Sequence, residues 1–194
     1  MSGRRAAFLD RDGTIIEDVS FISRPEQVVL RPGAAEAIAL LNANDVAVVV
    51  ITNQSGLARG LFTEADYEAV RARVDAVLAP YGARIDASFY CPHHPAVSGP
   101  CDCRKPGRLL FDEAIAALRI DAARSMFAGD RTRDVLPARH YGGRAYLVVA
   151  SSTPPEELDE APSVGATVVS SLLEAAEQFL ALPPVSRARV TSDA

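Results

Sequence analysis

The sequence predicts an α/β fold in which a mostly parallel sheet is covered by helices on both faces. Short apolar runs rich in β-branched residues alternate with longer segments of helical periodicity along most of the chain. The apolar runs are continuous, as expected for strands that are buried on both faces. Strand–helix alternation of this kind is typical of a parallel sheet with crossover helices.

The elements follow from these runs and from the turn residues between them. The predicted strands are Ala6–Leu9, Ala47–Ile51, Ala87–Tyr90, Ser125–Ala128, Ala145–Val149 and Thr167–Val169. The predicted helices are Ala34–Asn42, Glu64–Ala79, Leu109–Leu118, Thr132–His140 and Leu172–Leu182. Pro32–Gly33 marks the start of the first helix, and Thr63 with Asp66 has the pattern of an N-cap with an acidic first turn. We expect one domain over residues 1–185 and a polar tail without stable structure over residues 186–194.

The composition excludes several classes of function. The 194-residue chain is 48% hydrophobic and carries a formal net charge of −5, which argues against a nucleic-acid-binding surface. No apolar run reaches the length of a membrane span, and the start of the chain lacks a secretory signal. We therefore expect a cytoplasmic monomer that has no nucleic-acid or membrane partner.

Three polar clusters follow predicted strands and should meet at one edge of the sheet. Asp10 and Asp12 follow the first strand, Thr52 follows the second and Asp130 follows the fourth. In open parallel sheets, ligands bind beyond the carboxyl ends of the strands. The side chains of Asp10 and Asp12 point to the same side of an extended backbone, and Gly13 then permits a sharp turn. Such a pair suits a magnesium site with a carboxylate nucleophile and a carboxylic acid beside it.

These clusters carry the groups that a phosphoryl transfer requires. Asp10 is the candidate nucleophile, and Asp12 is the candidate general acid that later activates water. Asp130 is a candidate magnesium ligand, and Asp134, one helical turn later, would support that site.

Other residues are candidates for holding the phosphate. Thr52 and the backbone N–H groups beside it could bind phosphate oxygens. Lys105 could neutralise charge on a transferring phosphoryl group. Arg104 and Arg131 could hold a phosphate with two hydrogen bonds each, or pair with acids.

All three cysteines lie within residues 91–103, together with two histidines. The set Cys91, His93, Cys101 and Cys103 suits a closed, tetrahedral structural zinc site. The alternatives are unpaired cysteines or a local disulfide. Prolines and a glycine make this segment a stiff loop without a core, which a metal would stabilise. Four protein ligands leave no position for a reactive water, so the expected role of the zinc is to hold the loop that leads to Arg104 and Lys105.

The motifs together resemble those of the haloacid-dehalogenase-like phosphatases. Asp10-x-Asp12-Gly13-Thr14, Thr52, Lys105 and Gly129-Asp130-x-x-x-Asp134 look like the four motifs of that superfamily, in order. The resemblance covers the chain up to Leu182. It implies a Rossmann-like sheet and an aspartyl-phosphate intermediate. It also implies Mg²⁺ held by Asp10, Asp130 and the carbonyl of Asp12. The chain has no insertion large enough for a cap domain, so we expect none.

The loops resemble one branch of that family, which contains heptose bisphosphate phosphatases and histidinol-phosphate phosphatases. The segment from Asn53 to Gly60 and the cysteine pattern favour the heptose enzymes, and they imply substrate contacts by Asn53, Ser55, Arg59 and Arg104. The short spacing between His93 and Cys101, together with Arg131, favours histidinol phosphate. A non-catalytic phosphosugar-binding protein and a phosphotransferase or mutase remain as alternatives.

Overall fold

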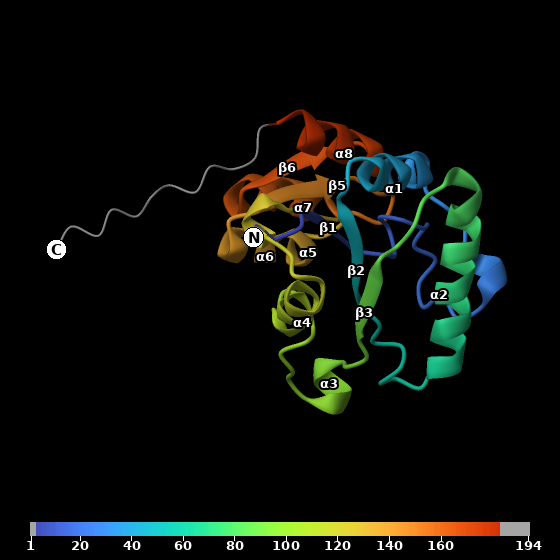
Figure 1. The fold of residues 1–194 in the computed structure, drawn as a ribbon. Helices are drawn as coiled ribbons and strands as arrows, with labels where there is room; N and C mark the ends of the chain where they lie inside the picture. Colours follow the sequence, from blue (N-terminus) through green and yellow to red (C-terminus); the bar gives the residue numbers. More distant parts are fainter. Residues whose placement is uncertain (1–2, 183–194) are drawn as a thin grey trace.

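The computed structural model describes residues 3–182 and contains a six-stranded parallel sheet (Figure 1). Its strands are β1 (Ala6–Leu9), β2 (Ala47–Asn53), β3 (Ala87–Cys91), β4 (Met126–Gly129), β5 (Arg144–Val148) and β6 (Ala166–Val169). The strand order is β3-β2-β1-β4-β5-β6, so β1 lies between β2 and β4. The expected tail over residues 186–194 lies outside the described residues.

Helices connect the strands. The α-helices are α1 (Ala34–Ala43), α2 (Glu64–Leu78), α3 (Pro95–Ser98), α4 (Leu109–Leu118), α5 (Thr132–Val135), α6 (Pro137–Tyr141), α7 (Pro155–Glu160) and α8 (Leu172–Ala181). Short 3₁₀ turns lie at Pro25–Gln27, Ala79–Tyr81, Ala122–Arg124 and Ala161–Val164. The expected cap of α2 is confirmed, because the Asp66 N–H donates to Thr63 Oγ1 and the Thr63 N–H donates to Asp66 Oδ2.

The predicted strands are confirmed to within two residues at each end, but one predicted helix is wrong. The segment Thr132–His140 forms two short helices, α5 and α6, which meet at Pro137. Proline has no backbone N–H to continue the helix, and it is well tolerated in the first turn of a new one. Helices α3 and α7, which also begin at prolines, were not predicted.

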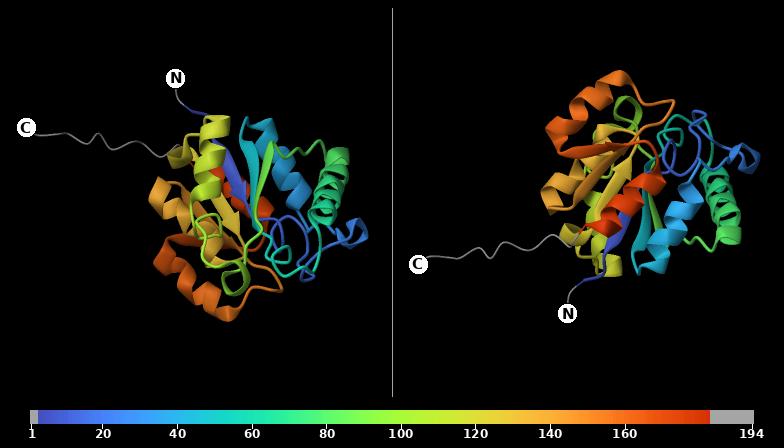
Figure 2. Two further views of the ribbon diagram at one scale, coloured as in Figure 1. Left: turned by 90° about the horizontal axis from the view of Figure 1, so that it is seen from below. Right: turned by 90° about the horizontal axis from the view of Figure 1, so that it is seen from above.

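Both faces of the sheet are covered, as the continuous apolar strands predict. Successive strand side chains point to opposite faces, so Ala7 and Leu9 join one buried cluster while Ala6 and Phe8 join the other. Helices α1, α2 and α8 contribute to the first cluster, and α4, α5 and α6 to the second. Figure 2 shows helices on both sides of the sheet. The second cluster includes the Phe8 ring, stacked 4.7 Å from that of Phe127.

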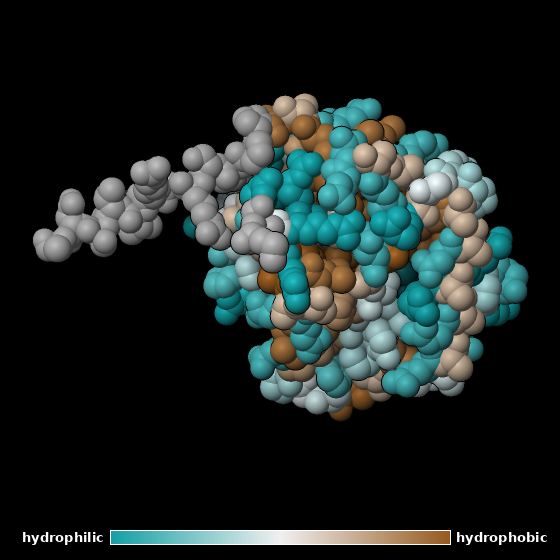
Figure 3. All heavy atoms as spheres, in the orientation of Figure 1, coloured by the Kyte–Doolittle hydropathy of each residue, from teal (hydrophilic) through white to brown (hydrophobic). Residues whose placement is uncertain are grey.

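The polarity of the surface is as expected when helices cover both apolar faces of the sheet. On the face drawn in Figure 3, polar residues cover most of the area and apolar residues form small groups between them. Within residues 3–182, no helix has the length and apolar character that crossing a membrane requires.

Candidate active site

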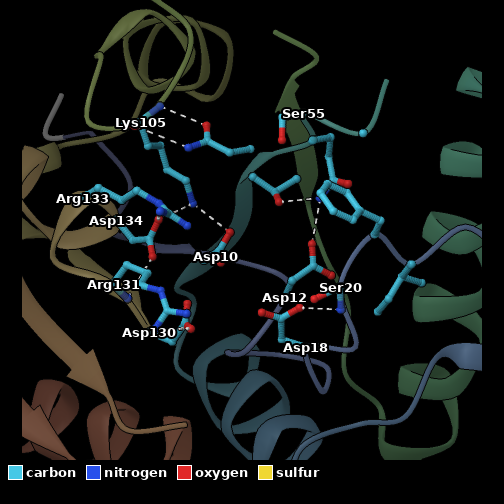
Figure 4. Close-up of a pocket in the computed structure, with 16 residues that line it drawn as sticks. Asp10, Asp12, Asp18, Ser20, Ser55, Lys105, Asp130, Arg131, Arg133 and Asp134 are labelled. Carbon is cyan, nitrogen blue, oxygen red and sulfur yellow. Dashed lines mark hydrogen bonds and ion pairs between the residues drawn. The ribbon is translucent and has the colours of Figure 1, made fainter. Parts of the chain in front are cut away.

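The three polar clusters meet at the carboxyl edge of the sheet, as predicted. Leu9 of β1 pairs with Val50 of β2 and Ala128 of β4, so Asp10 emerges between the ends of these two strands. These segments line a cavity of about 220 Å³ (Figure 4). The predicted site residues that line it are Asp10, Asp12, Thr52, Asn53, Ser55, Lys105, Asp130, Arg131 and Asp134. Lining residues that were not predicted are Asp18, Ser20, Phe21, Ile22, Gln54, Gly56 and Arg133.

Lys105 lies at the centre of the charged groups. Its Nζ lies 2.7 Å from Asp10 Oδ1, 2.8 Å from Asp134 Oδ1 and 2.6 Å from the carbonyl oxygen of Ile51. The side chains of this lysine and both aspartates are almost fully buried. Burial disfavours the charged lysine, but the two carboxylates outweigh it and raise the pKa of Lys105. Lys105 is therefore a buried cation that compensates two buried acids.

Two acids of this cluster, Asp10 and Asp130, have raised pKa values. Burial raises the pKa of Asp10 from 3.8 to about 7, with Lys105 opposing the shift and the other carboxylates adding to it. Burial and the nearby Asp134 raise the pKa of Asp130 to about 6, although Arg131 opposes this. One oxygen from each of Asp10, Asp130 and Asp134 lies within 4.8 Å of the other two. This carboxylate set fits a hard divalent cation, which would offset their mutual repulsion.

Gly13 allows the turn after β1 to approach Asp130 closely. Its φ is +82°, and a Cβ at this position would lie 2.7 Å from Asp130 Cγ. A larger residue would therefore be strained and would also displace the carboxylate. Arg31 stabilises this turn, because its guanidinium donates hydrogen bonds to the carbonyls of Gly13 and Val149.

The Asp12 carboxyl is held by Arg11 and Gln54. Its Oδ1 accepts from Arg11 Nε at 3.0 Å, and its Oδ2 accepts from Arg11 Nη2 at 2.9 Å and from Gln54 Nε2 at 2.8 Å. Gln54 Nε2 also donates to Thr52 Oγ1 at 2.9 Å. Gln54 thus connects two predicted site residues. Its position in the polar loop after β2 is the only feature of the sequence that could have indicated this role.

Asn53 contacts the backbone of Lys105. Its Oδ1 accepts from the Lys105 N–H at 3.0 Å, and its Nδ2 donates to the Lys105 carbonyl at 3.3 Å. This pair of hydrogen bonds fixes the segment that carries the buried cation to the end of β2.

The predicted substrate residues Arg59 and Arg104 do not line the cavity. Arg59 Nη2 lies 2.7 Å from His94 Nε2, and its guanidinium lies 5.5 Å from the centre of the Phe21 ring. Arg104 Nη1 donates to the His93 carbonyl at 3.4 Å. Arg59 therefore lies against Phe21, which lines the cavity, whereas Arg104 contacts the backbone at His93, which does not.

The predicted zinc ligands come together in the loop of residues 91–103, which we call the cysteine loop. The Sγ atom of Cys91 lies 2.9 Å from that of Cys103 and 3.7 Å from that of Cys101, and all three thiols are free. His93 Nδ1 lies 3.2 Å from Cys103 Sγ. Tetrahedral zinc with Zn–S bonds of about 2.3 Å would space the sulfurs by roughly 3.7 Å. The donor set fits zinc, and so do the Sγ separations of 3.7 Å and 3.5 Å that Cys101 makes with Cys91 and Cys103, whereas the 2.9 Å between Cys91 and Cys103 is shorter than a zinc site would give. The structure joins no two of these cysteines by a disulfide.

Comparison with known proteins places the chain in a family. The HAD-hydrolase-like family model matches residues 102–175. The D-glycero-β-D-manno-heptose-1,7-bisphosphate 7-phosphatase of Haemophilus ducreyi is 37% identical over 152 residues, 76% of this chain and 84% of the relative. The chain belongs to the HAD-like phosphatases.

Solved structures of this phosphatase family have the same fold. The D,D-heptose 1,7-bisphosphate phosphatase from B. bronchiseptica, complexed with magnesium and phosphate, has a TM-score of 0.82 and 36% identity, over 91% of this chain and 98% of its own. The D,D-heptose 1,7-bisphosphate phosphatase from Burkholderia thailandensis has a TM-score of 0.70 and 30% identity, over 92% and 100% of the two chains. The expected family and fold are confirmed.

The raised pKa of Asp10 predicts how stability depends on pH when no divalent metal is present. A carboxyl whose pKa is higher in the folded state favours folding when protonated, and this contribution is lost as pH rises from about 4 to about 7. Urea denaturation in EDTA should show the free energy of unfolding falling more across this range for the wild type than for Asp10→Asn, which cannot titrate. Equal pH dependence of the two proteins would contradict the assigned pKa.

Proposed function

We propose that this protein is a magnesium-dependent phosphatase that removes the C7 phosphate of D-glycero-D-manno-heptose 1,7-bisphosphate and leaves the C1 phosphate. This reaction belongs to nucleotide-heptose biosynthesis. The observation that carries the proposal is the buried Lys105, in contact with Asp10 and Asp134 beside Asp130. The similarity to heptose bisphosphate phosphatases supports the choice of substrate.

Asp10 is the proposed nucleophile, and it attacks phosphorus to form an aspartyl-phosphate. Asp10 lines the cavity, and Lys105 Nζ donates to its Oδ1, so Oδ2 is the oxygen that would attack. Lys105 and Thr52 would bind the phosphoryl oxygens, where positive charge and a hydroxyl offset the negative charge of the transition state.

Asp12 is the proposed general acid and base. It would protonate the sugar oxygen that leaves, and then take a proton from the water that hydrolyses the aspartyl-phosphate. The hydrogen bond from Gln54 to its Oδ2 orients the carboxyl next to Thr52. Arg11 holds the same carboxyl by donating from Nε to Oδ1 and from Nη2 to Oδ2.

The proposed magnesium ligands are the carboxylates of Asp10 and Asp130 and the main-chain carbonyl of Asp12. Bound there, Mg²⁺ would neutralise charge on the phosphoryl group. Asp134 would support the site by holding Lys105, which it contacts at 2.8 Å. The absence of a side chain on Gly13 leaves the room that these ligands require.

The remaining proposed contacts are with the substrate. Ser55 and Arg131 line the cavity and would meet the sugar and its phosphates. Asn53 lines it too, although both of its polar atoms contact Lys105. Arg59 and Arg104 lie outside, so their contact would be with the part of the substrate that projects from the cavity.

The cysteine loop is a proposed structural zinc site with the ligands Cys91, His93, Cys101 and Cys103. Its role would be to fix the segment that leads directly to Arg104 and Lys105. We further propose that the enzyme acts as a cytoplasmic monomer whose only required partner is its small phosphosugar substrate.

Loss of zinc should therefore disable the site indirectly. We expect about one zinc per chain, and we expect His93→Ala to lose the metal, lower Tm by about 5–15 °C and reduce phosphatase activity. Elemental analysis and thermal denaturation would measure this, with His94→Ala as the matched control that retains zinc. A fully active zinc-free wild type, or equal metal loss in both variants, would contradict the assignment.

The substrate is tested by phosphate release. Zinc-loaded protein with Mg²⁺ should hydrolyse one anomer of the heptose bisphosphate with a kcat/KM well above that for histidinol phosphate. Asp10→Asn should lower kcat by more than about 10³-fold because it lacks the nucleophile, while Glu113→Gln on the surface of α4 should not. Preference for histidinol phosphate would overturn the substrate proposal, and turnover by Asp10→Asn would overturn the mechanism.

A further inference from the structure

The cavity has two chemically different sides. Figure 4 shows Arg131 and Arg133 on the side of Lys105, Asp130 and Asp134, whereas Asp12, Asp18 and Ser20 lie on the opposite side. The second side offers carboxylate and hydroxyl oxygens, which suit sugar hydroxyls and would repel a phosphate. A substrate with two phosphates would therefore direct both toward the arginine side.

Arg133 is the arginine on that side with the weakest pairing. It lies on α5, and its side chain is 46% exposed. Its nearest carboxylate contact is from Nε to Asp134 Oδ1 at 3.9 Å, and that oxygen already lies 2.8 Å from Lys105 Nζ. Within residues 3–182, Arg133 has no side-chain hydrogen bond, so its guanidinium is available to a ligand.

Arg131 is more buried and lies closer to an acid, although its buried Nη1 has no hydrogen-bond partner. Its Nη1 lies 3.5 Å from Asp130 Oδ2, and its side chain is 16% exposed. The proposed metal ligand Asp130 thus already engages Arg131, while Lys105 engages Asp10 and Asp134. Of the three cations that line the cavity, Arg133 has the longest ion-pair distance, 3.9 Å to Asp134 Oδ1, and the most exposed side chain.

We propose that Arg133 binds the phosphate that is not transferred and thereby sets the preference for a sugar bisphosphate over a monophosphate. This inference rests on the proposed function and assigns Arg133 a role in substrate specificity. A guanidinium presents paired N–H donors that match two oxygens of a phosphate, which gives orientation as well as charge. It would also disfavour a substrate that carries an amine, such as histidinol phosphate.

The test compares two substrates that differ only in the second phosphate. We would measure kcat/KM for the heptose 1,7-bisphosphate and for the heptose 7-phosphate in wild type, Arg133→Ala, Arg133→Lys and Arg139→Ala. The ratio of the two values should fall about 10–100-fold in Arg133→Ala, mainly through KM for the bisphosphate, because a charged hydrogen bond is lost. Arg133→Lys should recover part of the ratio, and Arg139→Ala, an exposed arginine on α6, should leave it at the wild-type value.

Charge reversal provides a second variant. Arg133→Glu should lower the bisphosphate-to-monophosphate ratio further and should raise the relative activity on histidinol phosphate. A wild-type ratio in Arg133→Ala and Arg133→Glu, with both proteins folded by circular dichroism, would overturn the inference and leave the proposed function standing. A wild type that hydrolyses neither heptose phosphate would overturn both.

Discussion

The contact of Lys105 with Asp10 and Asp134 is the interaction on which the site depends. Buried carboxylates repel each other and lose hydration, so they require a cation inside the protein. Lys105 supplies it from a segment that follows the cysteine loop, and Asn53 fixes the backbone of that segment to the end of β2. The nucleophile candidate on β1 is thus tied to a loop distant in sequence. The proposed zinc would therefore affect the reaction indirectly, because it would position the loop that leads to Lys105.

The sheet and the loops position different groups of the site. The order β2-β1-β4 brings Thr52, Asp10 and Asp130 together, because Thr52 lies in β2 and the two aspartates directly follow β1 and β4. Of the groups proposed for phosphoryl transfer, Lys105 comes from a loop. The groups proposed for substrate choice stand on loops and on the short helix α5. Specificity can therefore change in this family without moving the strands that hold the reacting groups. Arg133 is such a position, because its side chain is half-exposed and its ion pair with Asp134 is long.

The strands and the reacting cluster were predictable because short-range patterns determine them. Continuous apolar runs specify buried parallel strands, and parallel strands bring the residues at their carboxyl ends together. The division of Thr132–His140 at Pro137 was also readable from proline chemistry, although the helical periodicity obscured it. The positions of Phe21 and Gln54 were not predictable, because tertiary contacts decide them. Ser20 and Phe21 adopt positive φ values, which the residue types at these positions do not predict. The Arg59 side chain contacts His94 and Phe21, which lie on other loops.

The central claim, that Asp10 accepts the phosphoryl group beside Lys105, can be tested most directly by crystallography with Mg²⁺ and beryllium trifluoride, which mimics a bound phosphoryl group. The account predicts beryllium bonded to an Asp10 carboxylate oxygen, with Lys105 Nζ and Thr52 Oγ1 on its fluorines. It also predicts Mg²⁺ bound by the Asp10 and Asp130 carboxylates. Beryllium on another carboxylate, or a Lys105 side chain displaced from the site in that complex, would contradict it.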